Sequence, residues 1–389
     1  MTKTLSHHHT LRTPSYLVEY AFYGLQFYLM LGEVLGLSIP LLGAGVLVVL
    51  VTFSFMHAGA RVMGLIRPIA PALLCALSTI VLQLVIHEET IAHSEMRSYV
   101  TWAWSLVVVQ MLLLRPQFFH RFAWVSFFLA CGTLPFIKVY VSTGELTRIG
   151  ATSGVGLANP NAFAMWFGFC YVYFLVLGLE TKNYLVRVAA WSAAIFSIYF
   201  VAATVSRGPL LGIVIASAFA FKNVLKRSFL PIISFLVCLW CIYVSGIADE
   251  LIGYYLERGT EESGRTYLWS VALESMWESW WVGVGISDAV ITLPSSGYKT
   301  NPHNGFLFIG LASGIIPLLF FITYLARVIR GALVSSHSRN QYAAFVFPLT
   351  VFALLEVMII GQAFMSIWHI VVFSIAISCC TNFSRRRVL

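Results

Sequence analysis

The chain has 389 residues, of which 59% are hydrophobic and only 10% are charged. Soluble domains carry about 25% charged residues, so this composition excludes a soluble globular protein and predicts a polytopic membrane protein. The net charge of +8 does not indicate a nucleic-acid partner, because basic residues of membrane proteins gather in their cytoplasmic loops.

A membrane-spanning helix needs about 20 mainly apolar residues. This rule predicts twelve spans: 15–34, 37–56, 66–86, 99–114, 122–142, 157–179, 188–205, 208–222, 229–246, 304–326, 341–361 and 363–381. With the N-terminus in the cytoplasm, seventeen of the 24 Lys and Arg residues fall in cytoplasmic loops, as the positive-inside rule requires. The sequence therefore predicts one all-α transmembrane domain over residues 1–389.

The loop 247–303, between the ninth and tenth spans, is the longest stretch outside the membrane. Within it, residues 265–281 have helical periodicity, with a polar face of Ser270, Glu274 and Glu278. Leu268, Val271, Ala272, Trp277 and Trp281 supply the apolar surface. We expect this amphipathic segment to lie in the outer membrane interface.

Seven basic residues fall on the outer side, against the positive-inside rule, so they need another explanation. They are Arg97, Lys138, Arg148, Arg207, Arg258, Arg265 and Lys299. For Arg97, Arg258 and Lys299, pairing with nearby acidic residues at a solvated surface is a sufficient explanation. The remaining four are candidate ligands for an anionic group.

Arg207 lies in a short turn, Ser206-Arg207-Gly208, and its planar fork either binds a phosphate group or extends to the lipid headgroups. Arg148 precedes a glycine-rich approach to a helix that begins at Asn159-Pro160-Asn161. Such a helix N-terminus favours anions, and Asn159 either caps the helix or contacts the ligand. Lys138 is expected one or two turns inside a span, where a charge is costly and often functional, and its side chain either has such a role or extends outward to the lipid headgroups.

Arg265 begins the interfacial helix, and His303 precedes a span that Asn304 is expected to cap. A histidine near arginines at the mouth of a membrane cavity has the pKa range of a general base, and the arginines favour its neutral form. The alternative is a histidine that only ties down the loop.

Neither a metal-binding cluster nor a nucleotide-binding motif is visible, so we expect no metal and no cofactor. Outward-facing arginines with one histidine are suited to transfer from a lipid-linked phosphate donor.

These motifs resemble the O-antigen ligase family. The resemblance covers about 145–320 and is carried by Arg148 with Asn159-Pro160-Asn161, Ser206-Arg207-Gly208, Gly264-Arg265 with Trp269, Gly283-x-Gly285, and His303-Asn304 with Leu307. Gly314 also matches the family pattern, whereas Pro317 stands where the family often has glycine.

The resemblance implies a metal-independent, inverting glycosyltransferase with GT-C-type architecture in the bacterial inner membrane. Such an enzyme transfers a polysaccharide from undecaprenyl diphosphate to lipid A–core at the periplasmic face. His303 matches the residue proposed to activate the acceptor hydroxyl. Arg207, Arg265 and Arg148 match residues proposed to bind the donor diphosphate, with Lys138 as a further candidate and Asn159, Asn161 and Asn304 as supporting residues.

Three alternatives stay open at this point. An O-antigen polymerase or a protein O-oligosaccharyltransferase of the same superfamily shares the lipid-linked donor. Twelve spans and anion-binding arginines also fit a transporter for lipid-linked oligosaccharides. A transporter predicts charged residues along the middles of several spans, where only Glu19, Glu33, Lys138 and Glu356 occur, most of them towards an end.

Overall fold

The computed structural model of the chain describes residues 16–32, 34–35, 62–90, 94–141, 147–152, 157–225, 240, 249, 253, 255, 264–294, 297, 299–336 and 342–380. The predicted span 37–56 lies outside these residues, as do Glu33, Arg258 and the predicted span 229–246 apart from Trp240. Each of the ten other predicted spans overlaps at least one helix.

The described part of the chain is mostly helical, which confirms the predicted class at that level. Its longer helices are α1 (Tyr16–Leu31), α4 (Ala70–Val85), α5 (Ser94–Leu112), α6 (Phe118–Gly132), α7 (Pro160–Glu180), α8 (Tyr184–Ala203), α9 (Arg207–Leu225), α12 (Arg265–Glu278), α13 (Gly305–Ser313), α14 (Ile315–Ser336), α15 (Ala343–Ile359) and α16 (Ile367–Cys380). The shorter ones are α3 (Val62–Ile66), η2 (Arg67–Ile69), η3 (Leu134–Phe136) and η4 (Ala363–Met365).

Four described helical segments are long and apolar enough to cross a membrane: Gly64–Val85, Pro160–Glu180, Tyr184–Ala203 and Ile315–Ser335. Helices α15 and α16 are apolar but shorter. The total of twelve spans and the GT-C-type arrangement stay predictions. So does the assignment of 247–303 to the periplasm.

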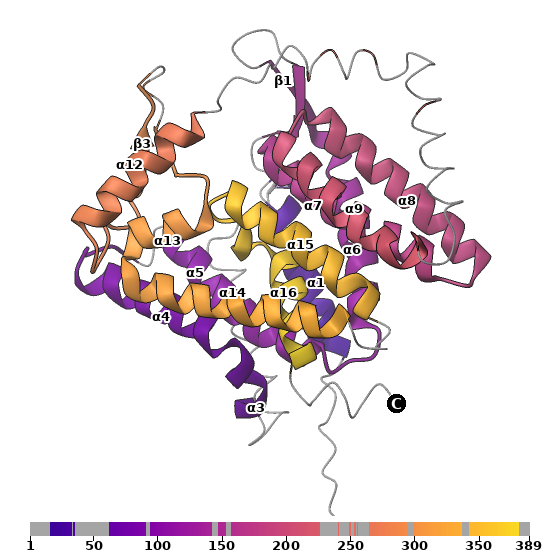
Figure 1. Cartoon of the computed structure of the whole chain (residues 1–389), viewed down its shortest axis with the longest axis horizontal. Helices are drawn as coiled ribbons and strands as arrows, with labels where there is room; N and C mark the ends of the chain where they lie inside the picture. Colours follow the sequence, from indigo (N-terminus) through magenta and orange to yellow (C-terminus); the bar gives the residue numbers. More distant parts are fainter. Residues whose placement is uncertain are drawn as a thin grey trace, which may run out of the picture.

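The helices form two groups that meet at α15 (Figure 1). Helices α7, α8 and α9 pack together on one side, and α4, α5, α14 and α16 pack together on the other. Helix α15 contacts α7 and α9 as well as α14 and α16. An element with neighbours on both sides is buried all round, which explains why α15 is apolar along most of its length.

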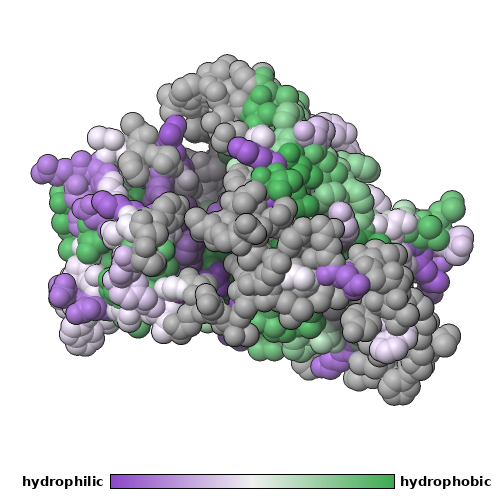
Figure 2. Space-filling model, turned by 90° about the horizontal axis from the view of Figure 1, so that it is seen from above, coloured by the Kyte–Doolittle hydropathy of each residue, from purple (hydrophilic) through white to green (hydrophobic). Residues whose placement is uncertain are grey.

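Helices α7 and α8 show how burial follows from sequence. Helix α7 is apolar all round and is buried along most of its length, with Phe163, Phe167 and Phe174 in the core. Helix α8 is equally apolar but exposes large side chains such as Leu185, Ile195 and Tyr199. In Figure 2 a broad hydrophobic area covers the side of α7–α9, whereas hydrophilic residues gather towards the α12 end. An exposed apolar face of this kind suits contact with lipid.

Two small antiparallel sheets interrupt the helical pattern. Strand β1 (Ile137–Val141) pairs with β2 (Thr147–Ala151), and β3 (Ile291–Thr292) pairs with β4 (Lys299–Thr300). The predicted span 122–142 is therefore wrong in its second half, because α6 ends at Gly132 and the chain continues through η3 into β1. The β-branched and aromatic residues of 137–141 favour a strand, which a hydropathy rule does not distinguish from a buried helix.

The predicted span 304–326 is also corrected, because it consists of two helices. Helix α13 ends at Gly314, whose φ of +77° is left-handed, and α14 starts at the next residue and runs beyond the predicted end. Glycine adopts this conformation without steric cost and is the usual helix terminator. The break lets the 280–285 segment dock against it, as described below.

Candidate active site

Arg148 is the centre of a hydrogen-bonded cluster at the start of α7 and α9. From β2 its Nε donates to the Thr204 carbonyl at 3.0 Å, and its second terminal nitrogen donates to Ser206 Oγ at 3.1 Å. The same nitrogen lies 3.4 Å from Asn161 Oδ1, which also accepts from Ser206 Oγ at 3.0 Å. The planar guanidinium thus joins three separate chain segments, a task that suits arginine better than lysine.

The two asparagines before α7 have different roles. Asn159 caps the helix, because its side chain accepts from the Asn161 backbone N–H at 2.8 Å and Pro160 occupies the first turn. Asn161, one residue into the helix, turns its amide oxygen to the Arg148 cluster. Of the two expected alternatives for Asn159, the structure shows the cap.

Arg207 is the first residue of α9 and is half-buried. Two residues before it, Val205 has a φ of +50°, which is strained for a β-branched residue. The next residue, Gly208, lies so close to α15 that a Cβ atom would be 2.7 Å from the Ile359 side chain. The turn that presents Arg207 is therefore fixed against the C-terminal end of α15 on one side and the Arg148 cluster on the other.

Arg265 is the first residue of α12, and the residue before it explains the Gly-Arg pair. Gly264 stands at the N-cap with a φ of +68°, a conformation that L side chains rarely adopt. Leu268 and Ala272 are buried on the inner face of α12 and hold the helix against the protein. Burial lowers the pKa of Arg265, and the negative charge of Glu356 opposes this effect.

His303 lies in the turn before α13 and has a φ of +48°, a left-handed conformation that is uncommon outside glycine. Two contacts hold it there. Its backbone N–H donates to Asn301 Oδ1 at 2.9 Å, and Trp269 Nε1 of α12 donates to the neighbouring Pro302 carbonyl at 2.9 Å. Such strain costs about 1–3 kcal/mol and persists where surrounding contacts impose it, often at functional sites.

The His303 ring is half-buried, and one of its nitrogens is engaged. Nε2 lies 3.0 Å from Thr300 Oγ1 on β4, and no described residue makes a hydrogen bond to Nδ1. Burial lowers the pKa of the imidazole below its ordinary value, and the positive charge of Arg265 lowers it further. Near neutral pH the ring is thus uncharged, the form in which a histidine accepts a proton.

Asn304 caps α13, as expected, because its side chain accepts from the backbone N–H groups of Phe306 and Leu307 at 3.0 and 3.2 Å. This cap fixes where α13 begins relative to His303. At the next residue, Gly305, a Cβ atom would lie 2.9 Å from Val357 of α15. The His303 turn therefore packs against the same end of α15 as the Arg207 turn.

The two glycines of Gly283-x-Gly285 let the segment after α12 dock on the α13–α14 break. Gly283 has a φ of +73°, and the next two backbone N–H groups donate to the carbonyls of Leu311 and Ala312 at 2.8 and 3.2 Å. The buried Gln83 of α4 accepts from Ile286 N and donates to the Ala312 carbonyl, both at 2.8 Å. This clamp fixes the end of α12 opposite Arg265.

Glu356 is a residue that the sequence analysis did not place in the site. It is fully buried in α15, and neither carboxyl oxygen has a hydrogen-bond partner among the described residues. A Cβ atom on Gly212 of α9 would lie 3.4 Å from its Oε1, and its charge acts on Arg265. A lone acid in an otherwise apolar run is the signal that could have identified it, since an ionisable residue within a span is a candidate functional residue.

The structure thus brings the predicted residues into two groups bridged by α15. One group holds Arg148, Asn161 and the turn of Arg207, and the other holds Arg265 and His303. Lys138 belongs to neither group. It is exposed on β1, paired in register with Gly150, so its expected position inside a span is wrong. Lys138 was a candidate because a charge inside a membrane span is costly and often functional. An exposed lysine on a strand does not have this desolvation cost.

Residues 192–322 match a protein-family model described as O-antigen ligase. The matched segment runs from α8 into α14 and includes Arg207, Arg265 and His303. No curated protein matches the chain.

Proposed function

We propose that this chain, whose residues 192–322 match the O-antigen ligase family, transfers a polysaccharide from undecaprenyl diphosphate to lipid A–core. The proposed reaction is inverting, needs no metal ion and takes place at the periplasmic face of the bacterial inner membrane. The family match supports an enzyme that acts on lipid-linked polysaccharide in a membrane. The donor, the acceptor and the mechanism are proposals.

The observation that carries the proposal is the hydrogen bond of 2.9 Å from Trp269 Nε1 to the Pro302 carbonyl, which joins the helix of Arg265 to the His303 turn, where the arginine charge acts on the imidazole. An arginine beside a neutral histidine brings together the two groups that this transfer needs, a cation for the diphosphate and a base for the acceptor. Because Thr300 engages Nε2, we assign the role of base to Nδ1. A threonine hydroxyl that accepts from Nε2–H leaves the lone pair on Nδ1.

In the proposed step, Nδ1 of His303 takes the proton of the acceptor hydroxyl as its oxygen attacks the anomeric carbon. The bond from that carbon to the diphosphate oxygen breaks from the opposite side, so the configuration inverts. Undecaprenyl diphosphate leaves with one more negative charge than it had in the donor. Arg265 and Arg207 would stabilise this charge directly, with Arg148 fixing the Ser206-Arg207 turn, because preorganised cations act where charge develops.

The resulting imidazolium would lie beside Arg265, a costly arrangement by itself. The negative charge of the leaving diphosphate offsets it. Glu356, a fully buried acid, interacts electrostatically with Arg265 on the protein side and has a place in the proposed site through this interaction.

The transporter alternative gains no support from the intramembrane charges that it needs. Glu19 is bound by Arg115 at 2.6 Å and by two nitrogens of Arg121 at 2.6 and 2.9 Å, an arrangement that fastens α1 to the α5–α6 turn. Lys138 lies on a strand. Among the described residues, the one charge given as acting on Glu356 is that of Arg265, so no row of further charges accompanies it.

The deciding experiment is a transfer assay with the purified chain in proteoliposomes, lipid-linked polysaccharide and lipid A–core, with chelator present. Transfer that survives the chelator and is lost in His303→Ala supports the proposal. His303→Asn is the matched variant, because an amide keeps hydrogen-bonding capacity without basicity. An active His303→Asn protein would overturn the base assignment. Chain growth on the lipid-linked substrate alone would identify a polymerase.

A further inference from the structure

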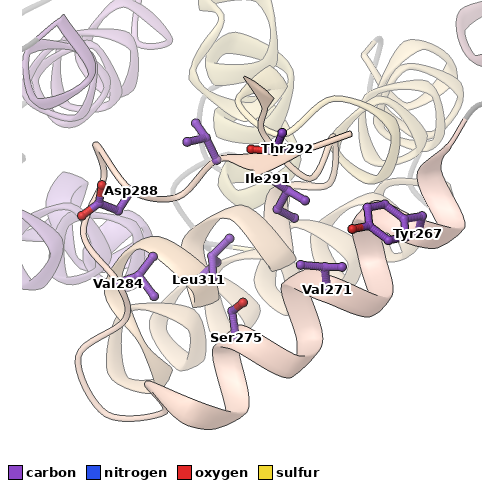
Figure 3. Close-up of a pocket in the computed structure, with 9 residues that line it drawn as sticks. Tyr267, Val271, Ser275, Val284, Asp288, Ile291, Thr292 and Leu311 are labelled. Atoms are coloured by element: carbon purple, nitrogen blue, oxygen red, sulfur yellow. The ribbon is translucent and has the colours of Figure 1, made fainter. Parts of the chain in front are cut away.

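A cavity of about 240 Å³ lies beside the candidate site, on the outer face of α12 (Figure 3). Its walls are one side of α12, the segment 284–292 that follows the helix, and the end of α13. Val271, Val284 and Leu311 supply an apolar surface. The cavity is open to the outside and none of the proposed catalytic groups lines it, so it is a second site.

Polar side chains stand around this apolar surface and have no side-chain partners in the part of the chain that the structure describes. Tyr267 and Ser275 come from α12, Asp288 from the following turn and Thr292 from β3 (Figure 3). Among the described residues, none of their side-chain oxygens makes a hydrogen bond or ion pair. Ligand sites combine an apolar wall with a few placed polar groups in this way.

The chemistry of the lining selects a neutral polyol. A tyrosine ring offers a face to the C–H groups of a sugar ring, and the hydroxyls and carboxylate match sugar hydroxyls as donors and acceptors. The one charged lining residue is Asp288, and the lining has no basic residue. A phosphate or diphosphate group would be repelled by that carboxylate and would find no cation, so the lipid-linked donor's diphosphate does not fit here.

The cavity is connected to His303 through the β3–β4 pair. Ile291 and Thr292 of the cavity wall lie opposite Thr300 and Lys299, and Thr300 contacts the imidazole. At the other end of the wall, Tyr267 is two residues from Arg265 on the same helix. A molecule held in the cavity is therefore separated from the proposed base by one two-stranded ribbon.

We propose that this cavity is a subsite for an uncharged sugar residue of the acceptor oligosaccharide. The inference rests on the proposed function for the name of its ligand, since the acceptor is the substrate whose sugar hydroxyl must reach His303. Tyr267 stacks on the ring, and Asp288 and Thr292 bind its hydroxyls. The subsite orients the acceptor while the arginines bind the donor, so different residues bind the two substrates.

The test measures acceptor and donor separately, with the full chain in detergent or nanodiscs. Binding of delipidated, dephosphorylated core oligosaccharide is measured by titration calorimetry and saturation-transfer NMR, without donor. Tyr267→Ala and Asp288→Asn are compared with Leu273→Ala, an exposed α12 residue outside the lining. We expect about tenfold weaker binding in the two cavity variants and unchanged binding in the Leu273→Ala control. In the transfer assay the acceptor KM should rise by a similar factor with the donor KM unchanged.

The two proposals fail in different ways. Unchanged oligosaccharide binding in folded Tyr267→Ala and Asp288→Asn proteins would overturn the subsite, whatever the transfer activity. A raised donor KM with unchanged acceptor binding would overturn it as well. Oligosaccharide binding that depends on Tyr267 in a protein without transfer activity would retain the subsite and overturn the ligase. The melting temperature of each variant confirms that it is folded.

Discussion

Thr300 Oγ1 lies 3.0 Å from Nε2 of His303 and fixes the ring of the proposed base. A residue that holds one imidazole nitrogen sets both the tautomer and the direction of the other. Thr300→Val keeps the shape and removes the hydrogen bond, so we expect a fall in kcat of roughly tenfold to a hundredfold through misorientation. The acceptor and donor KM values should change little. Thr300→Ser should restore the rate, and an unaffected Thr300→Val protein would contradict the role.

The pH dependence of transfer should reflect the lowered pKa of His303. Burial and the charge of Arg265 both lower this pKa. The midpoint of the acid limb of the kcat/KM profile should therefore lie below the ordinary histidine pKa of about 6.5. Arg265→Gln removes a positive charge near the ring, so the pKa rises towards that value. The residual activity of this variant should therefore be lost at a higher pH than in the unsubstituted protein. An acid limb that stays in place or moves to lower pH would contradict the coupling.

Glu356 should show a trade-off between stability and activity. Burying an ionisable acid without hydrogen bonds costs free energy, so Glu356→Gln should leave the melting temperature unchanged or raise it. The same change removes the acid that interacts with Arg265, and transfer should fall at least roughly tenfold.

The matched control is Thr350→Val, which removes another buried polar atom without a partner from the same helix. It should be similarly neutral or stabilising and keep full activity. Equal activity in both variants would show that the Glu356 charge does not contribute to the reaction.

Arg148→Lys tests whether the fork of the guanidinium is needed. A single ammonium group cannot reproduce the pair of contacts to Thr204 and Ser206, so the turn that presents Arg207 should loosen and the donor KM should rise roughly tenfold. Arg187→Lys is the control, since Arg187 also donates through two nitrogens, to the Thr181 carbonyl between α7 and α8. Equal effects of the two substitutions would indicate a general structural role rather than donor binding.

The helical class, the helix that begins at Arg265 and the caps at Asn159 and Asn304 were predictable, because each depends on local sequence. The β1–β2 hairpin was not, since an apolar run of β-branched residues is consistent with either a strand or a buried helix. Lys138 was misplaced for this reason. The place of Glu356 was equally hidden, because it depends on how α15 packs against α9 and on where α12 places Arg265, tertiary relationships with no local signal.

Gly283 gives a test of the clamp that holds the segment after α12. In Gly283→Ala the new Cβ atom would lie 2.5 Å from backbone atoms of Ala312 and Ser313, which cannot move without breaking the α13–α14 junction. We expect undocking of the segment and a loss of transfer of at least a hundredfold, because α12 then no longer holds Arg265 in place. Gly297→Ala is the control that separates this clash from backbone strain. Gly297 has a similar φ of +66°, but nothing lies within 4 Å of an added Cβ atom. Limited proteolysis should show new cleavage after α12 in Gly283→Ala alone, and equal sensitivity of the two variants would assign the effect to backbone strain.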